Sequence, residues 1–448
     1  MFGTDGIRGT PGVYPLTNEM LAKIAETVSR IILENKKSRI RCKIIIGKDT
    51  RLSGSHIENT LAKTFSQHGI DVFLSGIITT PGLSYLVEAK NADMGIMISA
   101  SHNKPADNGV KFFNAKGYKL SFAEEKQIEK ILLKQNPKDL AKLSPKRKGK
   151  VQALKNAQSL YTKFLTSTVK GLDLKSIRIA LDCAWGSASP FAEKIFKQLK
   201  ATVYSIHDKP HGKNINLGGA IQPNFLKQLV LRTGADIGIA LDGDADRVIL
   251  INEKGHILDG DYILAIMANY FLKNDRLSKN TVVTTVMSNL GLRKFLEEIG
   301  ASAIFTSVGD KHVLEALVKG NLNLGGEQSG HIIFLEHLPT PDGLLTSLQV
   351  LKVMKDTGLS LSELSQCITK FPQVLVNVRV RKKMPFEDMA AVSEKLQYFQ
   401  AQLRDQGRIF LRYSGTEPLA RVMVEGRDKA LVKNIAQSLA RQIKTELG

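Results

Sequence analysis

Short runs of apolar residues alternate along this chain with longer segments in which apolar residues recur at helical spacing. In the N-terminal part the apolar runs lie at residues 43–47, 72–74 and 94–100. Segments of helical periodicity lie at residues 57–68 and 80–91. Because short apolar strands separated by helices are typical of parallel sheets, the pattern predicts an α/β fold.

The same alternation returns twice further along, and then it changes. The further strands of this kind are expected at residues 177–182, 237–241, 281–286, 303–306 and 322–324. After Pro372 the pattern predicts strands at 373–381, 408–412 and 420–425, with helices at 389–403 and from 430 onward. This last order is typical of a small α+β domain with a mainly antiparallel sheet.

We therefore expect four domains, each of a common size. Three α/β domains are expected at residues 1–150, 151–253 and 254–368, and the α+β domain at residues 369–448. A basic, proline-bearing stretch at 137–150 is interpreted as a linker or an exposed loop between the first two domains.

Composition narrows the class of protein. The chain of 448 residues carries 63 Lys plus Arg against 43 Asp plus Glu, a net charge of +20. Aromatic residues make up only 6% and no recognition motif is present, so we expect no nucleic-acid partner. Cys42, Cys183 and Cys367 stand far apart, which indicates neither a disulfide framework nor a zinc site. With no long apolar run and no hydrophobic leader, we expect a cytoplasmic protein without a membrane span.

One candidate nucleophile stands at the end of an apolar strand. Ser101 lies in the sequence Ser99-Ala100-Ser101-His102-Asn103, directly after the apolar run 94–98. Active groups often occupy such strand ends in α/β sheets. A turn held by side-chain hydrogen bonds is the plain alternative. A Ser/His hydrolase is disfavoured because the Gly-x-Ser-x-Gly elbow is missing.

Three acidic residues form a candidate metal site. Asp242, Asp244 and Asp246 lie between the expected strands 237–241 and 248–252, and an extended backbone would place all three carboxylates on one side. Hard oxygen ligands favour Mg²⁺. An EF-hand is rejected because Arg247 stands where that loop needs glycine. A solvated acidic turn remains the alternative.

Two more polar segments suit a phosphorylated sugar. Gly326-Glu327-Gln328-Ser329-Gly330-His331 offers carboxylate, amide and hydroxyl groups for a ligand rich in hydroxyls. Arg412-Tyr413-Ser414-Gly415-Thr416-Glu417-Pro418, with Arg421 behind it, has the cations and the glycine of a phosphate-binding loop, without nucleotide P-loop spacing. A polar turn and a surface turn with solvated arginines are the alternatives.

The four motifs, in this order, resemble the α-D-phosphohexomutase family, and most closely its phosphoglucosamine mutase branch. The segments Phe2 to Gly9, Gly47 to Gly54 and Val286 to Gly291 are also similar to that branch. Departures from the usual pattern are Lys104, Trp185, Tyr413 and the run Gly309-Asp310-Lys311-His312. The resemblance implies three related α/β domains around a central cleft, plus a small C-terminal α+β domain that binds phosphate.

The resemblance also implies residue roles. Ser101 would be the phosphoserine and, with Asp242, Asp244 and Asp246, would bind Mg²⁺. Arg8, Lys111, Arg247 and His331 would surround the transferring phosphate or assist proton transfer, with the proton carrier open between His331 and Lys111. Glu327 and Ser329 would hold sugar hydroxyls. The non-reacting phosphate would be bound by Arg412, Ser414, Gly415, Thr416 and Arg421.

The implied activity is the interconversion of glucosamine 6-phosphate and glucosamine 1-phosphate, which feeds the synthesis of UDP-N-acetylglucosamine and cell-wall precursors. The reaction would pass through a 1,6-bisphosphate, with glucosamine or glucose 1,6-bisphosphate as activator, in a monomer or homodimer. A mutase for glucose or mannose phosphates is the nearest rival. A metal-dependent sugar phosphatase and a non-catalytic binder are more distant ones.

Overall fold

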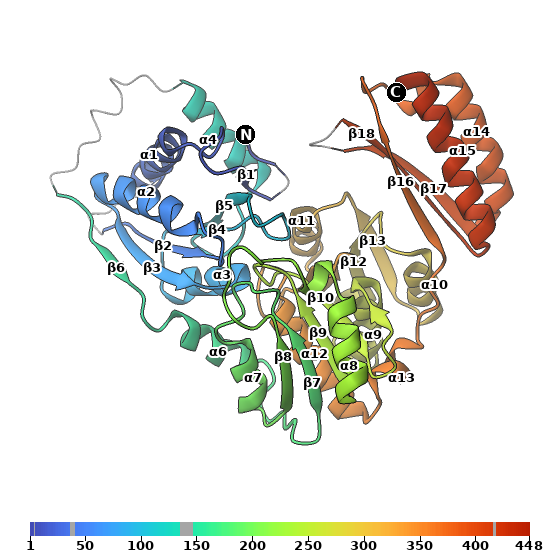
Figure 1. The fold of residues 1–448 in the computed structure, drawn as a ribbon, viewed down its shortest axis with the longest axis horizontal. Coiled ribbons are helices and arrows are strands. Elements are labelled where there is room, and N and C mark those ends of the chain that lie inside the picture. Colours follow the sequence, from blue (N-terminus) through green and yellow to red (C-terminus); the bar gives the residue numbers. More distant parts are fainter. Residues whose placement is uncertain (4, 36–40, 135–146, 415–417) are drawn as a thin grey trace. The chain divides into compact units, whose positions relative to one another are not determined.

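The computed structural model describes residues 1–3, 5–35, 41–134, 147–414 and 418–448, with Asn35 and Lys134 described in their backbone only. It divides into two compact units (Figure 1). Unit 1 comprises Met1–Met287 and Gly300–Cys367, and unit 2 comprises Ser288–Ile299 and Ile368–Gly448. Most of the expected linker, residues 137–146, lies outside the described residues.

The first sheet of unit 1 has the strand order β1-β5-β4-β2-β3-β6. Four of its strands are parallel, namely β2 (Lys43–Lys48), β3 (Asp71–Ile77), β4 (Met94–Ile98) and β6 (Val151–Ala153). Two are antiparallel to their neighbours, namely β5 (Asn108–Asn114) and β1 (Ile7–Gly9). Its helices are α1 (Asn18–Asn35), α2 (Gly54–Gln67), α3 (Thr80–Ala89) and α4 (Phe122–Lys134).

Strand β2 shows how this sheet forms its core. Ile44 and Ile46 pack into one apolar cluster with α1 and α2, and Ile45 between them is not part of that cluster. Successive side chains of a strand point to opposite faces, so a strand that is apolar throughout is buried on both. Helices α1, α2 and α4 contribute to the cluster on one face, and α3 packs on β2 and β4 outside it. The continuous apolar run at 43–47 therefore predicted a central strand correctly.

The second and third sheets repeat this plan. After α6 (Ala157–Ser167), the second sheet has the order β11-β10-β9-β7-β8, with β7 (Arg178–Asp182), β8 (Thr202–Ile206), β9 (Ile237–Leu241), β10 (Val248–Asn252) and β11 (Ile257–Leu258). Helices α7 (Ala192–Gln198) and α8 (Asn224–Thr233) belong to it. The third has the order β13-β12-β14-β15, with β12 (Thr281–Thr285), β13 (Ser302–Thr306), β14 (Leu324–Gly326) and β15 (Ile332–Phe334). Its helices in unit 1 are α9 (Gly260–Lys273), α11 (Asp310–Gly320), α12 (Gly343–Thr357) and α13 (Leu361–Ser365).

All three sheets contain a reversal of strand direction that positions the residues of the site. In each, one strand runs parallel to a neighbour on one side and then turns back into an antiparallel strand on the other. These pairs are β4 with β5, β9 with β10, and β14 with β15. Each reversal leaves an irregular loop at the carboxyl end of a buried strand, where α/β sheets commonly bind ligands. The three reversal loops hold the Ser101, Asp242 and Glu327 motifs, and three related α/β domains are confirmed.

Two short strands lie just beyond the expected domain limits at residues 150 and 253. Strand β6 pairs with β3, so the first sheet extends past residue 150. Strand β11 pairs with β10, so the second extends past residue 253. Neither strand has more than three residues, and segments this short carry too few apolar positions for a pattern to show which sheet they join.

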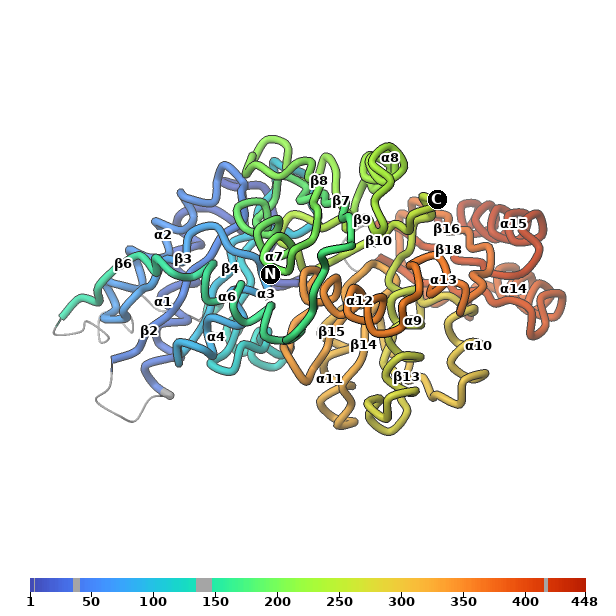
Figure 2. Tube along the Cα trace, turned by 90° about the horizontal axis from the view of Figure 1, so that it is seen from below, coloured from blue at the N-terminus to red at the C-terminus, as the bar shows by residue number. Residues whose placement is uncertain are grey.

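Unit 2 is a three-stranded antiparallel sheet with helices, as predicted for the C-terminal part. The order is β16-β18-β17, with β16 (Gln373–Arg379), β17 (Gly407–Tyr413) and β18 (Leu419–Gly426). Helices α14 (Ala390–Leu403) and α15 (Lys429–Leu447) lie side by side in both ribbon and tube views (Figure 2). Their apolar side chains pack with those of β16 and β18 in one core.

Helix α10 (Leu290–Glu298) clusters with unit 2, although it lies in the middle of the third α/β segment of the chain. Buried Glu425 of β18 accepts a hydrogen bond from the backbone N–H of Leu290 at 2.9 Å. Its other oxygen pairs with Arg408 at 2.7 Å. No sequence pattern predicted this connection, because it depends on one buried carboxylate that meets residues distant along the chain.

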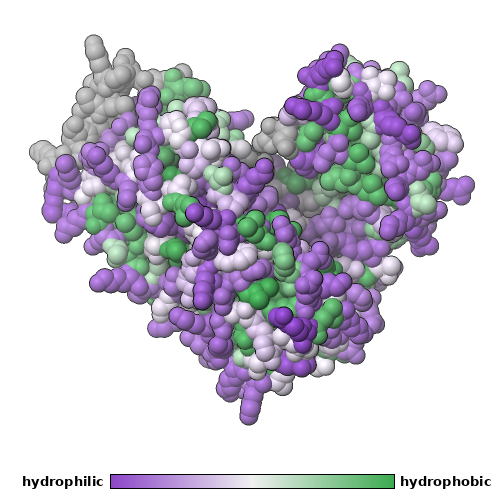
Figure 3. Space-filling model, in the orientation of Figure 1, coloured by the Kyte–Doolittle hydropathy of each residue, from purple (hydrophilic) through white to green (hydrophobic). Residues whose placement is uncertain are grey.

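Hydrophilic side chains cover most of the face drawn in Figure 3, and hydrophobic ones gather there in separate groups. Among the helices that the structure describes, none combines the length and the apolar character needed to cross a bilayer.

Tyr161 gives a stability prediction. Its hydroxyl donates to Asp342 Oδ2 at 2.5 Å, and both residues are fully buried. Burial raises the pKa of Asp342 to about 6, although the hydrogen bond from Tyr161 lowers it. Tyr161→Phe removes a donor from a buried carboxyl group, so we expect a loss of about 1–3 kcal/mol in the free energy of unfolding. Urea unfolding followed by the fluorescence of Trp185, the only tryptophan, measures it.

Tyr85→Phe is the matched control. The Tyr85 ring stacks on Phe164, which belongs to the same helix α6 as Tyr161, and the structure records no hydrogen bond from the Tyr85 hydroxyl to a described residue. Equal stability losses in the two variants would contradict a special role for the Tyr161 hydroxyl.

Candidate active site

Ser101 is held in an unusual backbone conformation at the end of β4. Its φ is +52°, in the left-handed region, and its side chain is buried. The hydroxyl Oγ donates to Asp242 Oδ2 at 3.1 Å and lies 3.2 Å from His102 Nδ1. Burial, with Arg247 and Arg8 nearby, lowers the pKa of His102 to about 3, so this imidazole is neutral. The structure thus points the Ser101 hydroxyl at the acidic loop of the second sheet.

The three aspartates lie together, but for a different reason than expected. The backbone through 242–246 is not extended, which was the condition for placing the three carboxylates on one side. The segment is a turn in which Ala245 has a φ of +56° and its N–H donates to the carbonyl of Asp242 at 3.1 Å. This turn gathers one carboxylate oxygen from each of Asp242, Asp244 and Asp246 within 4.8 Å of one another, and all three side chains are fully buried.

The electrostatics of this cluster indicate a missing positive charge. Burial first, and then repulsion from Asp246 and Asp244, raises the pKa of Asp242 to about 8. Asp244 Oδ1 is buried and has no hydrogen-bond partner among the described residues. An orphaned carboxylate oxygen beside two further carboxylates is the donor set that a small divalent cation with oxygen ligands requires. The residues therefore fit a metal ion of the Mg²⁺ type.

Lys111 is a buried cation that faces the same cluster from β5. Its Nζ lies 2.8 Å from Asp244, 3.3 Å from Asp246 and 2.7 Å from Asp5. Burial alone would lower the pKa of Lys111, but these carboxylates raise it well above the usual value. In turn, burial would raise the pKa of Asp246, and Lys111 with His331 holds it well below its usual value. Lys111 is therefore protonated in this arrangement.

Arg8 enters the site from the neighbouring strand. Strands β1 and β5 pair so that Arg8 stands opposite Gly109. The guanidinium pairs with Asp5 at 2.5 Å and donates to Asn103 Oδ1 at 3.0 Å. A Cβ on Gly109 would lie 2.6 Å from the carbonyl oxygen of Ser99 and 2.9 Å from that of Ile7, so the glycine lets these backbone segments approach closely beside Arg8.

His331 connects the third loop with the acidic cluster. Its Nε2 lies 3.1 Å from Asp246 Oδ1, and its Nδ1 lies 3.0 Å from Glu327 Oε1. Burial and Arg247 would lower the pKa of His331, but Asp246 and Glu327 raise it to about 9. A carboxylate beside each ring nitrogen favours the protonated ring, against the guanidinium of Arg247, whose Nε donates toward Nε2. Arg247 Nε lies 3.0 Å from the same Nε2.

The remaining residues expected to contact sugar differ in exposure. Both carboxylate oxygens of Glu327 are engaged, one by His331 and the other by the backbone N–H of Gly309 at 3.1 Å. Ser329 is exposed. The structure therefore brings Ser101, the three aspartates, Arg8, Lys111, Arg247, His331 and Glu327 into one network within unit 1, with Ser329 at its rim.

Unit 2 holds a separate cluster of cations. Arg412 and Arg421 stand opposite each other on β17 and β18. Burial and the charge of Arg421 lower the pKa of Arg412, and the Nε of Arg412 is buried with no hydrogen-bond partner among described residues. Ser414 Oγ lies 3.5 Å from an Arg421 nitrogen. Two arginines held opposite each other on paired strands favour an anionic ligand. The predicted Gly415 and Thr416 lie outside the described residues.

Four charged residues near the predicted ones were missed, three in unit 1 and one in unit 2. Asp5 pairs with Arg8, Lys111 and Lys119, and Lys119 continues to Asp310 at 2.6 Å. Asp5 lies in the segment Phe2 to Gly9 and Asp310 in the run Gly309 to His312, but no pattern predicted that they would meet. In unit 2, Lys383 donates to the carbonyl of Ser414 at 2.6 Å. Its only signal was the basic run 381–383.

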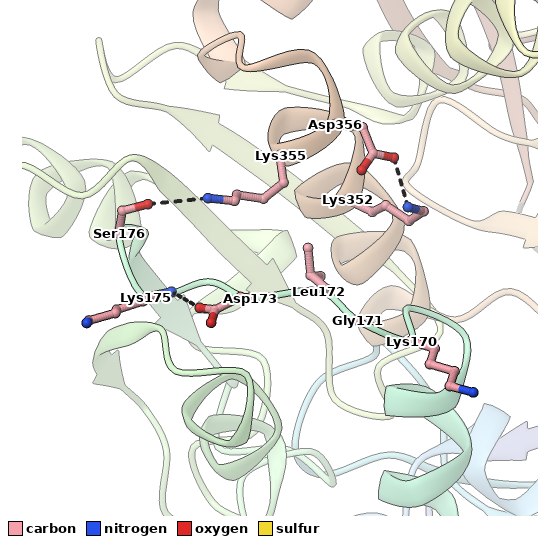
Figure 4. Close-up of a pocket in the computed structure, with 9 residues that line it drawn as sticks. All are labelled: Lys170, Gly171, Leu172, Asp173, Lys175, Ser176, Lys352, Lys355 and Asp356. Atoms are coloured by element: carbon pink, nitrogen blue, oxygen red, sulfur yellow. Dashed lines mark hydrogen bonds and ion pairs between the residues drawn. The ribbon is translucent and has the colours of Figure 1, made fainter.

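A further cavity of about 670 Å³ lies elsewhere on unit 1, between the segment 170–176 and the end of α12 (Figure 4). Its charged groups are largely paired locally. Lys352 pairs with Asp356 at 2.8 Å, and Lys355 donates to Ser176 at 3.4 Å. None of the residues predicted for the site lines it.

Comparison with known proteins agrees with this arrangement. Four models described as phosphoglucomutase/phosphomannomutase match the chain in order. They are α/β/α domain I at residues 1–139, domain II at 159–255, domain III at 259–371 and the C-terminal domain at 375–442.

Full-length relatives and solved structures point the same way. A phosphoglucosamine mutase of Geotalea uraniireducens is 45% identical over 450 residues, covering 100% of this chain and 98% of that protein. A phosphoglucomutase/phosphomannomutase family protein of Burkholderia thailandensis has the same fold, with a TM-score of 0.79 at 20% identity over 99% of this chain and 98% of that one. An N-acetylphosphoglucosamine mutase of Aspergillus fumigatus, solved with GlcNAc-6P and magnesium, has a TM-score of 0.68 at 17% identity over 100% and 96%.

Four domain models match the chain in order, and the chain is 45% identical over its full length to a phosphoglucosamine mutase. Together with the three reversal loops joined by buried charges, these matches show that the chain belongs to the α-D-phosphohexomutase family, that of the phosphoglucomutases and phosphomannomutases.

Proposed function

We propose that this protein interconverts glucosamine 6-phosphate and glucosamine 1-phosphate through a phosphorylated Ser101. The observation that carries the proposal is the 3.1 Å approach of the Ser101 hydroxyl to Asp242 in a cluster of three buried carboxylates. A serine hydroxyl is a weak phosphoryl acceptor until nearby charges align and stabilise the transfer. The 45% identity to a full-length phosphoglucosamine mutase supports glucosamine as the sugar.

The reaction would proceed in two transfers that return the enzyme to its starting state. In the first, the bond from Ser101 Oγ to phosphorus breaks and a bond from O1 of glucosamine 6-phosphate to phosphorus forms, giving the 1,6-bisphosphate. The bisphosphate then turns around. In the second, the bond from O6 to phosphorus breaks and the phosphoserine forms again, leaving glucosamine 1-phosphate. Glucosamine or glucose 1,6-bisphosphate would phosphorylate a newly made enzyme.

The chain's own cations would stabilise the transferring group. Lys111 and Arg8 approach the loop of Ser101 from β5 and β1, and both are charged. Preorganised cations in a buried site stabilise charge that develops on a phosphoryl group. Mg²⁺ held by Asp242, Asp244 and Asp246, with an oxygen at Ser101, would supply further neutralisation of that charge.

A group that is protonated at neutral pH would transfer the proton between the enzyme and the sugar hydroxyl. Lys111 and His331 are both protonated because carboxylates surround them. A protonated group suits the leaving oxygen, which needs a proton as its bond to phosphorus breaks. By microscopic reversibility the same group accepts a proton from the attacking hydroxyl in the other direction. We propose that one of these two residues has this role.

The non-reacting phosphate would bind to the cations of unit 2. We propose Arg412, Ser414 and Arg421 for this role, with Lys383 as a further cation beside Ser414, and with Gly415 and Thr416 as the sequence motif indicates. The opposed positions of Arg412 and Arg421 on paired strands support this assignment. Glu327 and Ser329 remain our candidates for the sugar hydroxyls, and residues 1–150, 151–253, 254–368 and 369–448 our approximate domains.

Ser101→Ala should abolish the reaction, because it removes the oxygen that carries the phosphoryl group. In ³¹P NMR of glucosamine 6-phosphate with Mg²⁺ and catalytic glucose 1,6-bisphosphate, we expect a 1-phosphate signal for the wild type and none for the variant. Glucose and mannose 6-phosphates are the comparison substrates. Ser167→Ala, at an exposed serine of α6, is the control. Substantial turnover by the Ser101 variant would refute the phosphoserine mechanism.

Lys111→Met should lower kcat by about 100- to 1000-fold, the loss typical when one preorganised charge is removed from a transition state. The methionine keeps the apolar stem and removes the ammonium group. Steady-state kinetics on glucosamine 6-phosphate measure it, and Lys116→Met, at an exposed lysine close by, is the control. A change confined to KM would show that Lys111 serves binding alone.

Asp242→Asn should stabilise the metal-free protein and abolish its activity. The substitution removes one of three mutually repelling buried carboxylates, so we expect a higher thermal midpoint without metal than in the wild type. Mg²⁺ at about 100 times its Kd should stabilise the wild type by about 2.7 kcal/mol and the variant much less. Calorimetry with and without EDTA tests this. Asp275→Asn, at an exposed aspartate, should change neither quantity.

A further inference from the structure

Asn216 connects two of the loops of the site with one side-chain amide. It lies in the second sheet's segment between β8 and the short helix Gly219–Ile221 and belongs to none of the motifs. Its Nδ2 donates to the carbonyl of Ser101 at 2.8 Å and to the carbonyl of Asn103 at 3.1 Å. Its Oδ1 accepts from the backbone N–H of Gly243 at 2.8 Å. The amide thus joins the serine loop to the acidic loop.

The two loops approach so closely at this point that no side chain fits between them. A Cβ on Gly243 would lie 2.9 Å from the carbonyl oxygen of Ser101 and 3.0 Å from Asn216 Nδ2. Both distances are shorter than ordinary van der Waals contact. Asn216 itself has a φ of +67°, a conformation that asparagine tolerates better than most residues. Its buried side chain makes three hydrogen bonds across this contact.

The same two carbonyls also accept hydrogen bonds from Arg51 of the first domain. Its Nη2 donates to the carbonyls of Ser101 and Asn103, each at 2.9 Å. The other nitrogens donate to Asp49, at 3.0 Å, and to the carbonyls of Asp107 and Lys104. Arg51 therefore orders the serine loop within its own domain. Asn216 binds both this ordered loop and the acidic loop of the next domain, beside the direct contact of Ser101 with Asp242.

We infer that Asn216 is a positioning residue that sets the Ser101 hydroxyl against the carboxylate of Asp242. It does not touch the reacting atoms. It fixes the backbone of Ser101 and the backbone next to Asp242, because the carbonyl of Ser101 and the N–H of Gly243 bind opposite ends of one planar amide. The catalytic consequence rests on the proposed function, whereas the link between the loops does not.

Two substitutions separate the amide from the rest of the side chain. Asn216→Asp keeps the shape and the acceptor for Gly243 but replaces the donor with an oxygen that faces two carbonyl oxygens. Asn216→Gly removes the side chain and accepts the positive φ. Asn323 offers a matched control, because its amide likewise donates to a backbone carbonyl and accepts from a backbone N–H, but both lie in one segment away from the site. It donates to the carbonyl of Arg276 at 2.8 Å and accepts from the N–H of Ser278 at 3.0 Å.

The first measurement is hydrogen exchange by mass spectrometry on the full chain without substrate. In both Asn216 variants we expect at least tenfold faster exchange in peptides covering 99–107 and 242–247. In Asn323→Asp and Asn323→Gly these peptides should exchange as in the wild type. Unchanged exchange of both loops in a folded Asn216 variant would overturn the inference. If N216D fails to fold, the exchange of the two loops in N216G decides the inference.

The second measurement separates kcat from KM on glucosamine 6-phosphate. A displacement of about 1 Å at reacting groups costs on the order of 100-fold in rate, so we expect kcat to fall about that much in N216D with KM changed less than about threefold. The Asn323 variants should keep wild-type values. An equal fall in kcat in N323D, or a change in KM alone, would overturn the positioning role. A wild type with no mutase activity would refute the proposed function, and the exchange result would still decide the link.

Discussion

The burial of three carboxylates in one turn is the constraint on which this structure depends. Asp242, Asp244 and Asp246 are fully buried and lie within reach of a single ion. Like charges this close and this far from water are strongly unfavourable unless cations compensate them. The surrounding cations compensate these charges. Lys111 and His331 pair with aspartates of the acidic loop, and Arg8 contributes a further positive charge nearby.

The compensating charges also connect the three sheets of unit 1. Lys111 of the first sheet pairs with Asp246 of the second, and His331 of the third pairs with the same aspartate. From Lys111 the charges continue through Asp5 and Lys119 to Asp310 of α11. Asp310 adjoins Gly309, whose N–H donates to Glu327, the partner of His331. Lys111, Asp5 and Lys119 each have opposite charges on two sides, and these ion pairs compensate for the burial of the three groups.

The backbone of the site is held as firmly as its charges. Ser101 and Ala245 both adopt left-handed conformations that side chains disfavour. Such conformations persist only where surrounding contacts determine them, and here Arg51 and Asn216 bind the carbonyls that the serine loop turns inward. Gly243 completes the arrangement because it lets the two loops touch. Precise placement of the serine therefore depends on residues outside the chemical motifs.

The sequence by itself determined the fold class and most of the chemical groups. Apolar runs such as 43–47 mark buried strands because both faces of the sheet are covered, and three aspartates at alternate positions indicated a candidate metal site because three such close carboxylates repel one another unless a cation compensates them. It did not show the turn at Ala245, the placement of α10 with unit 2 through Glu425, or the roles of Asp5, Lys119 and Asn216. Each of these depends on contacts between residues more than 20 positions apart or on a local φ that side-chain identity does not specify. Periodicity reports the burial of a face, whereas only the packed tertiary structure decides which buried charges and carbonyls meet.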